Sequence, residues 1–179
     1  MKQTRPSHFS RPISATVLPA VAMGVAFGLA WASSARAASS ATQDVDITVQ
    51  SVNEISVGST VTLTINSAIA GQSLTGSTTS SYAITTNSAT SKKITAQLAA
   101  PLDSGLTLSV FLQAPAGGTS AGSLAAPVAL NSATASDVVT SIEAVAAPSL
   151  TINYAATAAV TVAPNTYSAD VTYTITNDS

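Results

Sequence analysis

Three stretches between residues 82 and 112 alternate apolar and polar side chains at every second residue. A period of two is typical of β-strands that have one buried and one solvated face. The connections at residues 87–91 and 101–105 contain the Asn, Ser, Pro and Gly residues that favour chain reversals. The sequence therefore predicts three consecutive antiparallel strands, paired as a meander. Their apolar rows are Tyr82, Ile84 and Thr86; Ile94, Ala96 and Leu98; and Leu106, Leu108, Val110 and Leu112.

The same alternation precedes this region. Residues 44–57 place Val45, Ile47 and Val49 on one face, and an irregularity near Val52 then shifts the phase. A β-bulge at that point is the simplest explanation, so the sequence predicts an interrupted strand here.

Further alternating runs are separated by segments rich in Ser, Thr, Gly and Pro, which predict loops. About eight or nine short strands separated in this way are typical of an all-β chain. We therefore predict an antiparallel β-sandwich, immunoglobulin-like or pilin-like, formed by residues 44–179 as a single domain. The remaining predicted strands cover 60–65, 127–130, 137–142, 150–158 and 167–176. The longest predicted loops cover 66–80, with one short extended piece, and 114–126.

The first 37 residues have the three parts of a helical signal peptide. Lys2, Arg5 and Arg11 give a positive start, residues 13–32 are apolar, and Ala35 and Ala37 are the small residues of a cleavage site. We predict cleavage after Ala37, followed by a flexible lead-in at residues 38–43.

A retained membrane anchor is the alternative, because about 20 apolar residues can span a bilayer. Pro19 within the apolar run and the alanine-rich cleavage site favour removal. The expected location is therefore secreted, extracellular or at the cell surface, with passage through the periplasm.

Cleavage would leave Lys92 and Lys93 as the only basic side chains, against all eight acidic residues. The formal net charge would then change from −2 for the whole chain to −6. Such a surface repels phosphate, so we expect neither nucleic acid nor a membrane surface as a partner. The chain also has no cysteine, so no disulfide can stabilise an exported domain.

The predicted mature chain has neither His nor Cys, which excludes Ser-His-Asp and Cys-His catalysis and the usual zinc sites. Asp44 and Asp46 share a strand face and are the best candidates for carboxylate catalysis or calcium binding. Solvated charges that protect a sheet edge are the competing interpretation. We predict a protein that is not an enzyme, with no catalytic, cofactor-binding or metal site.

Three other residue types could carry chemistry. Lys92 or Lys93 could form an intramolecular isopeptide bond with an Asn or Asp, or could simply be an edge or loop charge. Phe111 is out of phase with its apolar neighbours and should face outward, as a sugar-stacking ring would. Asp103, in the sequence PLDSG, fits a residue of a turn.

The last predicted strand, YSADVTYTIT (residues 167–176), resembles the closing strand of secreted bacterial pilus-subunit-like sandwiches, including the spore coat protein U type. The resemblance implies a non-catalytic subunit whose strands pair between molecules. The expected function is a secreted or cell-surface fibre, coat or matrix subunit. The alternative is an extracellular binding module, an adhesin or carbohydrate binder. The expected partners are further copies of the chain, a surface protein or a polysaccharide.

Overall fold

The computed structural model describes residues 40–66 and 69–179. These residues form nine strands and no helix, arranged in two antiparallel sheets. The predicted all-β class and number of strands are thus confirmed, and the arrangement is sandwich-like. None of the described residues belongs to a helix long and apolar enough to cross a membrane. The predicted signal peptide, its cleavage site after Ala37 and residues 38–39 of the lead-in lie outside the described residues.

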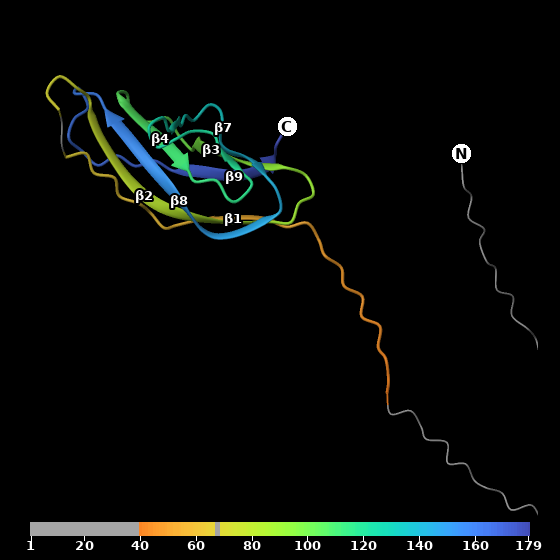
Figure 1. The fold of residues 1–179 in the computed structure, drawn as a ribbon. Helices are drawn as coiled ribbons and strands as arrows, with labels where there is room; N and C mark the ends of the chain where they lie inside the picture. Colours follow the sequence, from red (N-terminus) through yellow and green to blue (C-terminus); the bar gives the residue numbers. More distant parts are fainter. Residues whose placement is uncertain (1–39, 67–68) are drawn as a thin grey trace, which may run out of the picture. The chain divides into compact units, whose positions relative to one another are not determined.

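All nine strands lie in one compact unit, Ile47–Ser179. One sheet has the strand order β1-β2-β8-β4-β6 and the other the order β5-β7-β3-β9 (Figure 1). The strands are β1 (Asn53–Val57), β2 (Leu74–Thr86), β3 (Lys92–Leu98), β4 (Leu106–Leu112), β5 (Thr119–Ser120), β6 (Val128–Ala129), β7 (Ser136–Ile142), β8 (Val145–Ala158) and β9 (Val171–Asn177).

The prediction of a meander between residues 82 and 112 is wrong. β2, β3 and β4 do occupy this region, but β3 lies in the opposite sheet from β2 and β4. Alternation specifies that each strand has one buried face and not which sheet it joins. The two connections are long enough to cross the roughly 10 Å between packed sheets. The chain therefore changes sheet twice where a meander would have stayed in one.

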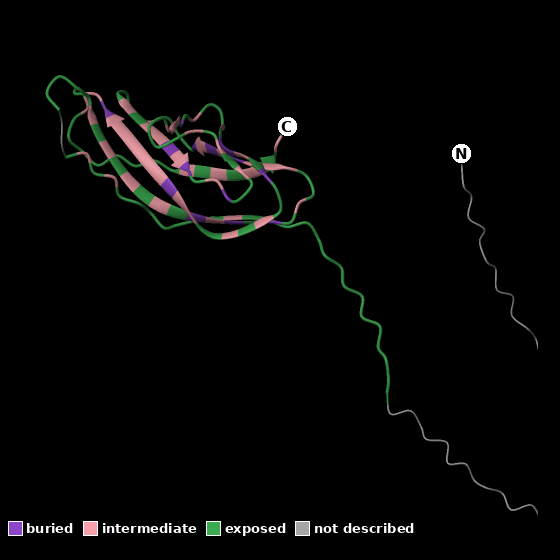
Figure 2. Ribbon diagram, in the orientation of Figure 1, coloured by how far each residue is buried: buried purple, intermediate pink, exposed green. Residues whose placement is uncertain are grey.

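A single hydrophobic core lies between the inner faces of the two sheets. Burial alternates along the strands (Figure 2), so the apolar rows read from the sequence do face inward. Each large aliphatic side chain buried in this way contributes roughly 1.5–3 kcal/mol. The first sheet contributes Tyr82, Ile84, Val110, Leu112 and Ile152, and the second Ile94, Ala96, Leu98, Val138, Val139 and Ile142.

β2 and β8 are the longest strands and pair along nearly their whole length (Figure 1). The predicted loop at residues 66–80 is therefore wrong from Leu74 onward, because that polar segment is the first half of β2. The ladder is interrupted where Ala83 faces Pro148 and Ser149. A proline cannot donate a ladder hydrogen bond, and it is accommodated at this irregularity.

The predicted strand at residues 60–65 is also wrong, since this segment pairs with no neighbour. It instead packs against β2 at Gly76. A Cβ atom added to Gly76 would lie 2.7 Å from the Thr64 carbonyl oxygen and 2.9 Å from Ile65 Cγ1. Gly76 lies on the same face of β2 as the buried residues Tyr82 and Ile84. The segment therefore packs against the inner face of the sheet. Its alternation reflects packing on a sheet face and not a backbone ladder.

The interrupted strand predicted at residues 44–57 is confirmed only for its second part. β1 begins at Asn53, and residues 44–52 are exposed with no strand partner (Figure 2). The closing strand is likewise shorter than predicted, beginning at Val171. Its apolar row of Val171, Tyr173 and Ile175 does pack against the core.

Candidate functional site

The two candidate catalytic carboxylates, Asp44 and Asp46, lie on an exposed segment without regular secondary structure. In the described part of the chain, no three His, Cys, Asp or Glu side chains gather closely enough to hold a metal ion. The structure therefore assembles no acidic cluster around these residues within 40–66 and 69–179.

The two lysines of β3 have different partners. The Lys93 ammonium lies 3.2 Å from an Asp137 carboxylate oxygen on β7, in an ion pair open to solvent. Lys92 donates a hydrogen bond to the side-chain carbonyl of Asn177, its direct neighbour on β9. Lys92 thus meets an asparagine, as the isopeptide hypothesis requires, but this contact is exposed.

Asp103 closes a tight turn. Its backbone carbonyl accepts a 3.0 Å hydrogen bond from the Leu106 amide, and Gly105 has φ of 90°. Glycine reaches this left-handed conformation without the cost that other residues carry. The predicted role of Asp103 as a turn residue is therefore consistent with the geometry.

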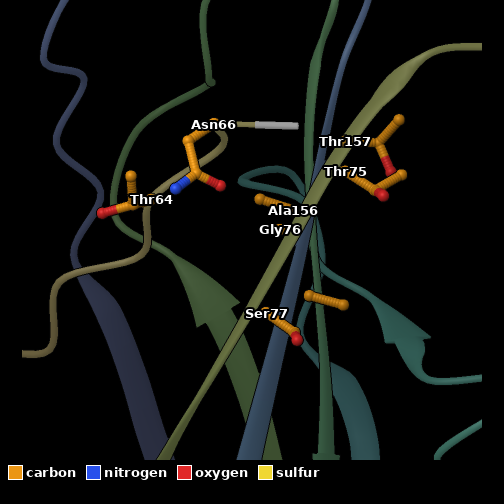
Figure 3. A pocket seen from close by; sticks show the side chains of 8 residues that line it. Thr64, Asn66, Thr75, Gly76, Ser77, Ala156 and Thr157 are labelled. Atoms are coloured by element: carbon orange, nitrogen blue, oxygen red, sulfur yellow. The ribbon is translucent and has the colours of Figure 1, made fainter. Parts of the chain in front are cut away.

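A hollow of about 420 Å³ on the described surface lies between Thr64 and Asn66 on one side and the paired strands β2 and β8 on the other. Figure 3 shows Thr64 and Asn66 on one side, with Thr75, Ser77 and Thr157 on the strands. These side chains can exchange hydrogen bonds with a polar ligand. None of them is charged or a strong nucleophile, so the hollow offers no group for acid–base catalysis.

A smaller hollow of about 160 Å³ contains Phe111, Leu124 and Pro127. Phe111 pairs with Asn153 and faces away from the core, as its phase in the sequence predicted. It is half-buried, beside a loop that carries the exposed Leu124. Tyr154 also lines this hollow, but it packs against the core, so Phe111 is the ring here that could stack on a sugar from the outer face.

Asn87 holds the segment before β1 at its base, and its backbone amide donates a 3.2 Å hydrogen bond to the Val52 carbonyl. The Asn87 side-chain carbonyl accepts a 2.7 Å hydrogen bond from the Val52 amide, and its NH₂ group donates a 2.8 Å bond to the Gln50 carbonyl. We call residues 44–49, which precede this contact, the N-terminal arm. All three of its apolar side chains are largely exposed: Val45 is 73 %, Ile47 83 % and Val49 77 % exposed.

The four outer strands of the two sheets differ in length. β5 and β6 have two residues each and β1 has five, whereas β9 has seven and pairs with β3 in continuous register. Natural proteins protect sheet edges with short strands, prolines, lysines or bulges. β9 has none of these within Val171–Asn177. The sequence predicted the strand but gave no indication that it would stand at an edge.

Comparison of the chain with protein-family models, with curated proteins and with solved structures gives no match.

Proposed function

We propose that this protein is a secreted or cell-surface structural protein without catalytic activity, a fibre, coat or matrix subunit that assembles by strand pairing. The observation that carries the proposal is the combination of the exposed apolar arm with the unprotected seven-residue edge of β9. A segment with alternating exposed apolar residues and a free sheet edge are the two halves of a β-strand addition.

Two features support a non-catalytic role. The described side chains bring together no acidic or metal-ligating cluster, and both hollows are lined by uncharged residues. We also propose that the sandwich has a pilin-like or immunoglobulin-like topology and that residues 1–37 are an export leader. The strand pairing implied by the resemblance of residues 167–176 concerns the same strand, β9.

Size analysis and electron microscopy of the purified protein test the proposal. We expect oligomers or fibres whose abundance rises with protein concentration. A variant in which Val45, Ile47 and Val49 are all replaced by Thr should remain folded and should shift toward the monomer. A wild-type protein that stays strictly monomeric at all concentrations would contradict the proposal.

An extracellular binding module is the second candidate, and the exposed loop beside Phe111 favours it. A polysaccharide could contact Phe111, Leu124 and Pro127 on the outer face of the sheet. A glycan array with the wild type and the variant Phe111→Ala tests this function. Binding that the variant loses would favour it over a structural role, and an array without hits would count against it.

A further inference from the structure

We propose that the free edge of β9 in one copy of the protein receives the N-terminal arm of a second copy as an additional antiparallel strand. The inference rests on the proposed function, assembly by strand pairing, and goes further by naming the donor of the added strand, a second copy, and the register of the pairing. Three observations carry it: the direction of the β9 backbone groups, the burial of its side chains and the pattern of the arm.

The backbone of β9 has groups available for a new ladder. At its two ends, the Asp170 carbonyl accepts a hydrogen bond from Ala99, and the Asp178 amide donates one to Ser91. In an antiparallel pair, alternate residues bond to alternate sides. The even-numbered residues therefore direct their backbone N–H and C=O groups to β3. The odd-numbered residues direct theirs to the free edge. Those residues are Val171, Tyr173, Ile175 and Asn177.

The side chains of β9 leave the core incompletely covered. On β3, Ile94 and Ala96 are 0 % exposed, while their partners Ile175 and Tyr173 are only half-buried although they face the same core. The inward-facing side chains of β9 are thus less buried than those of the neighbouring strand β3. A further strand with apolar residues on its inner face would bury these side chains, and each Å² of apolar surface removed from water contributes about 25 cal/mol.

The arm matches this edge in length and in pattern. Six residues in extended conformation span about 20 Å, close to the length of β9. Val45, Ile47 and Val49 would face the core beside the apolar row of β9. Asp44 and Asp46 would then lie on the outer face, in water, beside the row of threonines at 172, 174 and 176.

Matching the inner faces defines the register. Ile47 lies opposite Tyr173, Val45 opposite Ile175 and Val49 opposite Val171, as hydrogen-bonded pairs. Thr48 then lies opposite Thr172 on the outer face, in a pair without ladder hydrogen bonds. The Cα atoms of such a pair are about 4.5 Å apart.

A second copy is the occupant because of how the arm is attached. Gln50 and Val52 are both bonded to Asn87, and the chain continues from there directly into β1 of the opposite sheet. For an arm to reach β9 of its own molecule, the chain would have to reverse within residues 50–52 and break these bonds. An arm donated to the next copy needs no reversal. Repeated donation of this kind is a heterologous contact, which builds either a closed ring or an open filament.

Cysteine pairing tests the edge and the register, because the natural chain contains no cysteine. Full-length Thr48→Cys protein is mixed with Thr172→Cys protein under mild oxidation, and the linked peptides are identified by mass spectrometry. A Cα separation near 4.5 Å permits a disulfide, so we expect a Thr48–Thr172 cross-link as the main product. Both substitutions lie on the outer face and leave the core unchanged.

Ser56→Cys provides the matched control, because Ser56 occupies the equivalent outer-face position on β1, the edge strand of the other sheet. A main cross-link from Thr48→Cys to Ser56→Cys would overturn the β9 edge while leaving assembly by strand pairing intact. A main cross-link to Thr174→Cys or Thr176→Cys would overturn the register. Oligomers that form without any of these cross-links would overturn the role of the arm. A wild-type protein that never self-associates would overturn the proposed function itself.

Discussion

The hydroxyl of Tyr173 donates a 2.9 Å hydrogen bond to the hydroxyl of Tyr154. Tyr173 lies on β9, the edge strand of one sheet, and Tyr154 on β8, the central strand of the other. Burial raises the pKa of both phenols, and the neighbouring Tyr154 hydroxyl raises that of Tyr173 further. The folded state therefore favours the neutral pair, which joins the two sheets near the free edge.

We expect the protein to lose stability as the pH rises above about 10. Tyrosines of the unfolded chain release their protons near this pH, whereas Tyr154 and Tyr173 hold theirs to higher pH in the fold. The stabilisation is thus fully present below about pH 10 and declines above it. Urea unfolding between about pH 8 and 11 measures the effect. In Tyr173→Phe the decline should be shallower, and an unchanged slope in this variant would contradict the assignment.

Gly76 is the position where we expect the smallest substitution to have a large effect. The added Cβ of Gly76→Ala would lie 2.7 Å from the Thr64 carbonyl oxygen, so the segment at residues 63–65 would have to move away from the sheet. Overpacking of this kind costs about 1–3 kcal/mol of unfolding free energy, measurable by urea denaturation. Gly118→Ala is the control, because its nearest neighbour would be a Pro115 side-chain atom at 3.3 Å. Equal stability of the two variants would contradict the packing described here.

The contact between Lys92 and Asn177 should remain a hydrogen bond. An isopeptide bond would join Lys92 Nζ to Asn177 Cγ and release ammonia, and the attacking amine must be neutral and activated by its surroundings. The contact is exposed to water, so we expect the intact mass to match that calculated from the sequence of the purified chain, without loss of ammonia. A mass lower by one ammonia molecule in the wild type, but not in Lys92→Ala, would contradict this expectation.

The core strands could be predicted from the sequence because their apolar residues alternate. Ile94, Ala96 and Leu98 face inward on β3 as expected, and so do Val110 and Leu112 on β4. Sheet membership could not be predicted, because a pattern of period two is the same in either sheet. The first half of β2 was missed for another reason. Its inner face carries Gly76, Thr78 and Ser80, so it has no apolar row to detect.

The candidate site was predicted only in part. The sequence drew attention to the two end segments and predicted Val45, Ile47 and Val49 as one face of a strand. Their apolar alternation is real, yet no strand of the described chain pairs with them. The exposed edge of β9 follows from the order of all nine strands, which no local pattern encodes.

The base of the arm offers a last prediction. Asn87→Ala removes both side-chain hydrogen bonds, to the Val52 amide and to the Gln50 carbonyl, but keeps the backbone bond from residue 87 to the Val52 carbonyl. It should therefore loosen this junction while leaving the core intact. Each neutral hydrogen bond contributes about 0.5–1.5 kcal/mol, so we expect a small loss of unfolding free energy. Hydrogen exchange is the sharper measurement, since the Val52 amide loses its acceptor and should exchange faster. The amides of β3 should keep their protection. Asn165→Ala, at an exposed asparagine before β9, is the control, and the same Val52 exchange rate in both variants would contradict the role of Asn87.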